Sequence, residues 1–319
     1  MDCRGSKLLG FLFIIAGSSA LFAQSAKDHS IGATKWLAPD GRVAALTTSP
    51  IVRLSIKNIT PAKVTKYAAG ESLFHTPTLL GGQAAKAGIS CASCHTSGRT
   101  NIHFQFPGVS GAPGTADVTH SFFSSVRGNE TLDPVPIPDL TQPGKISHDP
   151  GDAQLEKFVR DLIVEEFDGV EPGQAVLDAI SFYIRSLAAP TDENGEMQIA
   201  PLTIVVHFDR AEEAFESAIS YWQDGDRNMA SLLFAGARHQ LRLMHERFDL
   251  EDLRKEQKAL EKLGQKLGVI QRATLTSEPL PYNLLQEWTD GFSRARDTLG
   301  ETADQSLYNP EILAASLQN

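Results

Sequence analysis

The stretch GISCASCHTSGRTN, residues 88–101, decides which fold this sequence predicts. It contains Cys91 and Cys94, two of the three cysteines in the chain, and His95 directly after the second. A Cys-x-x-Cys pair serves in a redox-active disulfide, in half of a zinc site, or in the covalent attachment of haem. The rest of the sequence must distinguish these three chemistries.

Two of the three chemistries lack the residues that they require. A structural zinc site needs four ligands, usually from a second close pair of cysteines or histidines, and no second Cys pair is present. A thioredoxin-like motif follows a strand and opens a helix, whereas the approach at 81–88 is rich in glycine. Cys-x-x-Cys-His is the attachment sequence of haem c. We therefore predict one covalent haem c, bound through Cys91 and Cys94, with His95 as the proximal iron ligand.

Residues 1–23 have the layout of a secretory signal peptide. Arg4 and Lys7 precede an apolar core, and small residues lead to Ala23, after which we expect cleavage. The apolar stretch 8–23 has 16 residues, fewer than the roughly 20 that a membrane span needs. Cys3 is expected to leave with the peptide. The sequence thus predicts a periplasmic protein that is not integral to the membrane after cleavage, with an uncleaved anchor as the alternative.

Composition and charge narrow the range of partners. The chain has 319 residues, of which 41% are hydrophobic and 21% charged, as in ordinary packed domains. This length suggests two domains. The net charge is −10, and loss of the signal peptide, whose own charge is +1, gives −11. Such acidity excludes nucleic acid and anionic membrane surfaces as partners and permits docking to a redox protein partner with a basic face.

Hydrophobic periodicity divides the mature chain. We predict an N-terminal arm at 24–62, with a short strand in IVRLSIKN (51–58), and a mono-haem cytochrome c domain at 63–190. Within this domain, apolar residues recur at helical spacing over 63–74, 152–168 and 172–187, on either side of a proline-rich loop region. After a linker at 191–202, four amphipathic helical patterns in 203–319 predict an antiparallel helical bundle. The predicted fold class is all-α.

Two segments resemble a known family. AAGESLFHTPTLLGGQAAKAGISCASCH (68–95) is similar to the entry of bacterial di-haem cytochrome c peroxidases and their MauG-like relatives. IPDLTQPGKISHDPGDAQLEKFVRDLI (137–163) resembles their later segment, in which a Pro-x-Leu run leads to a His-Asp turn and a helix. The resemblance covers about 65–190 and places His148 and Asp149 at the His-Asp positions. It implies a cytochrome c fold and peroxidase activity, although this chain has one haem motif where the family has two.

The sixth iron ligand is the open question, because a thioether and an imidazole set different potentials. The leading candidate is His148, as a distal ligand, and the alternatives are His120, His103, Met197 and an open or water-ligated iron. The remaining methionines of the mature chain, Met229 and Met244, are expected to pack in the bundle core, and the bundle histidines, His239 and His245, to have surface or capping roles.

Glu130 and Arg127 form a candidate acid–base pair for peroxide on an open haem. Arg127 could instead pair with a haem propionate.

Three functions fit these features. The first, which we favour, is an exported c-type cytochrome that transfers electrons through its haem iron. The second is a cytochrome c peroxidase-like oxidoreductase that reduces hydrogen peroxide. The third is a haem-bearing sensor or assembly subunit whose helical bundle binds a protein partner.

Overall fold

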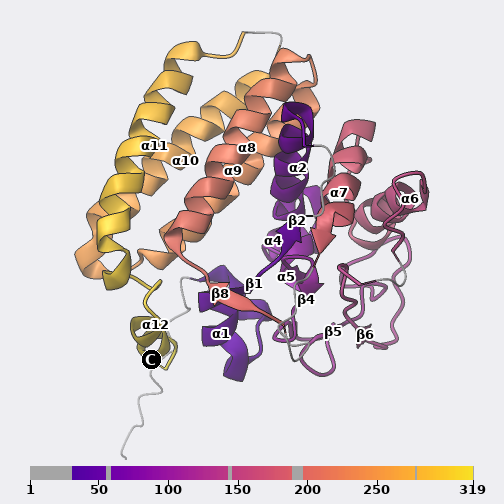
Figure 1. The fold of residues 1–319 in the computed structure, drawn as a ribbon. Helices are drawn as coiled ribbons and strands as arrows, with labels where there is room; N and C mark the ends of the chain where they lie inside the picture. The colour runs from indigo at the N-terminus through magenta and orange to yellow at the C-terminus, as the bar shows by residue number, and fades with distance from the viewer. Residues whose placement is uncertain (1–30, 55–58, 143–145, 189–196, 277–278, 319) are drawn as a thin grey trace, which may run out of the picture.

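The computed structural model describes residues 31–54, 59–142, 146–188, 197–276 and 279–318 (Figure 1). The predicted signal peptide with Cys3, and residues 191–196 of the predicted linker, lie outside these residues. The described chain is mostly helical, with twelve α-helices and eight strands of two or three residues each. No described helix is both long enough and apolar enough to cross a membrane. The mostly helical class predicted from the sequence is confirmed.

The N-terminal arm contains more helix than the sequence suggested. Its helix α1 (Arg42–Thr47) leads into β1 (Thr48–Pro50), which pairs in antiparallel fashion with β8 (Ile199–Pro201). The short strand expected in 51–58 is found as β2 (Arg53–Leu54), paired with β7 (Leu187–Ala188), while 55–58 lie outside the described residues. The arm therefore joins segments that are far apart in the sequence.

Helix α2 (Pro61–Phe74) is the central helix of the molecule. Its first turn begins at Pro61, where the missing N–H costs nothing, and Thr60 accepts a hydrogen bond from the N–H of Lys63. The predicted helix at 63–74 is confirmed and starts two residues earlier. In Figure 1, α2 stands between the bundle helices and α7 (Gln174–Ser186).

The segment from Pro77 to Pro136, which contains the Cys-x-x-Cys-His sequence, consists of short elements joined by loops. It is held together by two small antiparallel pairs, β3 (His95–Thr96) with β4 (Arg99–Thr100), and β5 (Thr115–Ala116) with β6 (Val135–Pro136). The three short helices before these pairs are α3 (Pro77–Leu80), α4 (Gly82–Lys86) and α5 (Cys91–Cys94).

The two helices predicted after the loop region are confirmed. The first is α6 (Gln154–Asp161), continued by a π-helical turn (Leu162–Glu166), and the second is α7. Both present an apolar stripe to the core, with Leu155, Val159 and Ile163 buried on the first.

The C-terminal half forms the four predicted helices and one more. They are α8 (Ile204–Gln223), α9 (Arg227–Arg247), α10 (Arg254–Thr274) and α11 (Tyr282–Thr302), followed by the unexpected α12 (Pro310–Leu317). Met229 and Met244 are fully buried, as predicted for core packing. Phe215 and Trp288 stack with ring centroids 4.0 Å apart, which fixes α11 against α8.

Both halves of the molecule pack on α2. On one side a Cβ at Gly70 would overlap the carbonyl oxygen of Ala179 in α7, so only glycine allows this approach. On the other side, Gly236 of α9 lies directly against Ser72. The Glu71 carboxylate pairs with Arg210 of α8 at 3.0 Å. One continuous hydrophobic core therefore crosses the predicted boundary near residue 190, and the division into domains stays a prediction.

The contact at Gly70 gives a test of this packing. Gly70→Ala forces α2 away from the backbone of α7, so we expect a loss of about 1–3 kcal/mol in the free energy of unfolding, measured by urea denaturation. The matched control is Gly300→Ala on the exposed side of α11, where nothing lies within 4 Å of the new Cβ. That variant should gain about 0.5–1 kcal/mol. Equal behaviour of the two variants would contradict the close approach.

Candidate functional site

The two cysteines of the motif lie at the ends of a one-turn helix, α5. Such a short helix is marginal alone, and here side chains complete its first turn. The N–H of Ser90 donates to Ser93 Oγ at 3.0 Å, which satisfies a backbone group at the start of the helix. The turn therefore presents Cys91 and Cys94 from a fixed backbone.

Both thiols are free and half-buried. Burial raises the pKa of Cys91 to about 12, and burial followed by the neighbouring Cys91 raises the pKa of Cys94 further. At neutral pH both are protonated thiols. Redox-active and metal-binding cysteines instead have lowered pKa values, so these thiols do not have the environment of a thioredoxin-like pair.

The imidazole of His95 is held in one tautomer. Its Nδ1 lies 3.0 Å from the carbonyl oxygen of Pro138, and because a carbonyl only accepts, Nδ1 carries the proton. Burial lowers the pKa of His95 to about 4, although this hydrogen bond and Asp139 act in the opposite direction. The ring is thus neutral with its lone pair on Nε2, the form in which histidine binds a metal ion.

The segment Ile137–Leu140 lies along the hairpin that follows the motif. Thr100 Oγ1 donates to the Ile137 carbonyl at 2.8 Å, and the N–H of Leu140 donates to the Gly98 carbonyl at 2.8 Å. Together with the bond from His95 in β3, these contacts fix the Ile137–Leu140 segment against both strands of the β3–β4 hairpin. This is the IPDL run that the sequence analysis noted only as part of a family resemblance.

Arg99 is a residue that the sequence analysis missed. Its Nε lies 2.7 Å from the Asp139 carboxylate, and the side chain is 13% exposed. Its Nη1 is buried and has no hydrogen-bond partner among the described residues. A buried guanidinium with an unused donor suits an anionic group. The signal available in the sequence was a cation four residues after the motif histidine.

These residues fit haem c. Two free thiols, a neutral imidazole with Nε2 available, and a buried cation with an unused donor are the groups that a covalently bound, carboxylate-bearing haem requires. In the part of the chain that the structure describes, no group of three or more His, Cys, Asp or Glu side chains could hold a bare metal ion, and His239 and His245 belong to none.

Two candidate sixth ligands, His148 and His120, are hydrogen-bonded to backbone groups. His148 Nε2 donates to the Leu140 carbonyl at 2.9 Å, so ligation through Nε2 requires the ring to leave that oxygen. His120 Nδ1 accepts from the N–H of Phe122 at 3.1 Å, which places the proton on Nε2. The sixth ligand stays a prediction.

The two other candidate ligands, His103 and Met197, lie next to the N-terminal arm and next to β8, respectively. His103 packs against Gly41 of the arm, where a Cβ would overlap its ring. Met197 is 37% exposed, next to β8.

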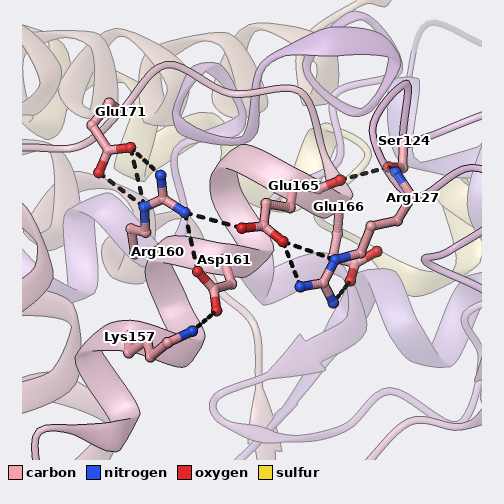
Figure 2. A network of polar contacts seen from close by, with 8 residues as sticks. All are labelled: Ser124, Arg127, Lys157, Arg160, Asp161, Glu165, Glu166 and Glu171. Atoms are coloured by element: carbon pink, nitrogen blue, oxygen red, sulfur yellow. Dashed lines mark hydrogen bonds and ion pairs between the residues drawn. The ribbon is translucent and has the colours of Figure 1, made fainter.

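Arg127 has different partners from those expected. Figure 2 shows its guanidinium between two carboxylates of the π-helical turn, Glu165 and Glu166, with Glu166 Oε1 at 3.0 Å. Glu130 lies instead 3.5 Å from Ser121 Oγ, at the surface. The π-helical turn is what presents two consecutive carboxylates to one arginine.

Glu166 is the buried member of this network. Its Oε2 is buried without a hydrogen-bond partner among the described residues. Burial raises the pKa of Glu166, and Arg127 opposes that effect. Arg160 lies on the other side of Glu165 in Figure 2, bonded to Glu165 and Glu171, so the network extends to the surface.

The chain has no significant match to a known family model, to a curated protein or to a solved structure.

The Glu166 environment predicts a pH-dependent effect. Arg127→Gln leaves a buried carboxylate unpaired, so the variant should be less stable than wild type at pH 7. Because burial raises the folded-state pKa of Glu166, the ionised carboxylate destabilises the folded protein. This destabilisation is absent at low pH and grows as pH rises above the ordinary carboxyl pKa. The deficit should therefore shrink at pH 4, as measured by urea unfolding at both pH values.

Lys157→Gln is the control, since Lys157 belongs to the same network but its side chain is 75% exposed. It should change stability by at most about 0.5 kcal/mol at either pH. A deficit of Arg127→Gln that is the same at pH 4 and pH 7 would contradict the role given to Glu166.

Proposed function

We propose that this chain is an exported c-type cytochrome that carries one haem, bonded through Cys91 and Cys94 with His95 as proximal iron ligand, and that it transfers electrons. Residues 63–190 would then form a cytochrome c-type haem domain, followed by the helical bundle. The resemblance to di-haem cytochrome c peroxidases over about 65–190 supports the same haem chemistry, with a single haem in place of two.

The observation that carries the proposal is the hydrogen bond from His95 Nδ1 to the Pro138 carbonyl. The raised thiol pKa values do not fit a redox-active pair, and a structural zinc site would need further ligands. Iron in haem needs one axial imidazole with a defined tautomer and ring orientation, which this bond supplies.

The haem would supply one-electron exchange between ferric and ferrous iron. The chain's own residues bind and orient it: the two thiols fix its position, His95 fixes one axial side, and the Arg99 guanidinium offers an unused donor to a carboxylate. The acidic chain, with a net charge of −10, favours a redox protein partner with a basic docking face.

One observation favours peroxide reduction as a second candidate. Both His148 Nε2 and His120 Nδ1 are bonded to backbone groups, so ligation through either atom requires that bond to break. An open sixth position is what a peroxidase requires and what a simple carrier avoids.

The attachment chemistry can be tested by mutation. Cys91→Ala with Cys94→Ala should abolish covalent haem, because the thioethers have no other source of sulfur. The measurement is haem staining of the protein after denaturing electrophoresis, following expression with export and haem maturation. Cys3→Ala, in the predicted signal peptide, should leave the stain unchanged. A double variant that still stains would overturn the haem assignment.

The sixth ligand decides between carrier and peroxidase. If His148 is the ligand, the ferric protein should have a low-spin bis-histidine spectrum and turn over peroxide poorly, and His148→Ala should become high-spin. A wild-type protein that is already high-spin, binds cyanide and oxidises a reduced donor with peroxide would favour the peroxidase. An unchanged spectrum in His148→Ala would exclude His148 as the sixth ligand and would leave the electron-carrier function standing.

A further inference from the structure

A cavity of about 140 Å³ lies behind the Cys-x-x-Cys-His turn, where three parts of the chain meet. The arm at 31–49 forms one wall, and Ser90, Ala92 and Ser93 of the motif region form a second. Helices α8 and α9 form the third. In Figure 1 this is the region where α1, β1 and α5 lie near the lower ends of the bundle helices.

The charged groups along this cavity are mostly positive. Among the described residues that line it are three guanidinium groups and one carboxylate, those of Arg210, Arg242, Arg247 and Glu246. The carboxylate accepts from Arg242 Nε at 2.9 Å. Arg247 donates to the carbonyls of Leu46 and Leu307 and has no carboxylate partner there. Arg210 pairs with Glu71 at 3.0 Å, so Arg247 is the one guanidinium of this lining without a carboxylate partner among the described residues. In a chain of net charge −10, this small positive excess favours an anion.

Two hydrogen-bond donors at the cavity lack an acceptor. Trp36 lines the cavity, and its indole Nε1 is buried without a partner among the described residues. The imidazole of His239 also lines it and makes no hydrogen bond within the described residues. The two other histidines of the lining differ, since His75 Nδ1 donates to the Glu71 carbonyl and His207 Nδ1 to Gln240 Oε1, both at 2.9 Å. The buried indole N–H of Trp36 is costly without an acceptor, and a bound oxygen would satisfy it and would accept from His239 as well.

The rest of the lining combines aliphatic side chains with hydroxyl and amide side chains. Leu37, Ala45, Leu46 and Leu243 contribute to it, and the volume holds on the order of ten water-sized positions. A bare inorganic anion would leave this surface without a partner. A carboxylate with a short aliphatic chain would use both the donors and the apolar wall.

We propose that this cavity binds a short-chain aliphatic monocarboxylate. Its carboxylate oxygens accept from Trp36 Nε1, from His239 and from Arg242, and its methylene groups pack on the leucines of the arm and of α9. The donors that the proposal uses are separate from Cys91, Cys94 and His95, and Ala92 and Ser93, between the two cysteines, form part of the cavity wall.

The probe is butyrate, titrated into the full chain and followed by isothermal titration calorimetry. We expect saturable binding at one site, and no binding of butylamine, which has the same chain and the opposite charge. Trp36→Phe keeps the ring and removes the N–H, so it should weaken butyrate binding about tenfold. The matched control is Trp222→Phe, whose indole N–H is also buried and unpartnered but lies outside this cavity, and which should bind as wild type does.

Ala45→Leu provides a second variant that fills the cavity without removing a polar group. It should abolish butyrate binding while the circular dichroism spectrum is retained. The proposal is overturned if the full chain does not bind butyrate, if butylamine binds equally well, or if Trp36→Phe and Trp222→Phe have the same affinity. Undiminished binding in Ala45→Leu would also overturn it.

Discussion

The hydrogen bond between His95 Nδ1 and the Pro138 carbonyl is the constraint on which the motif region depends. It joins residues 43 positions apart and closes a long loop region that has little regular structure of its own. Loop closure of this length costs entropy, which the neighbouring contacts of Ile137 and Leu140 with the hairpin help to offset. Without this segment the histidine would retain its place in the sequence but have neither a fixed tautomer nor a fixed direction.

Helix α2 connects the motif region to the rest of the molecule, because it packs against α7 on one side and against α8 and α9 on the other. Its glycine at position 70 brings α7 into backbone contact, and its opposite side meets α8 and α9 through Glu71 and Ser72. Small residues and one ion pair therefore set the spacing on both sides of a single helix. The Cys-x-x-Cys-His segment and the bundle are fixed relative to each other because both pack on α2.

The sequence predicted those features that leave a local pattern. Helices such as α7 and α10 have a 3.6-residue hydrophobic period, and the Cys-x-x-Cys-His spacing expresses chemistry within five residues. The features that were missed depend on distant partners. Arg99 becomes notable only when Asp139 lies beside it and its Nη1 is buried, and Arg127 meets Glu166 only because a π-helical turn presents that carboxylate. α12 was missed because its apolar residues pack on the arm, which is at the other end of the sequence.

The contacts of Arg247 have a consequence for the order in which the chain folds. This buried guanidinium donates to the carbonyls of Leu46, near the beginning of the chain, and Leu307, near its end. During synthesis, the contacts of Arg247 with both chain ends therefore form only after almost the whole chain has emerged. The contacts of the motif with the Ile137–Leu140 segment can form much earlier. The pairing of the two chain ends has a high contact order and is expected to form late. Until then Cys91 and Cys94 belong to a chain whose two ends have not yet paired.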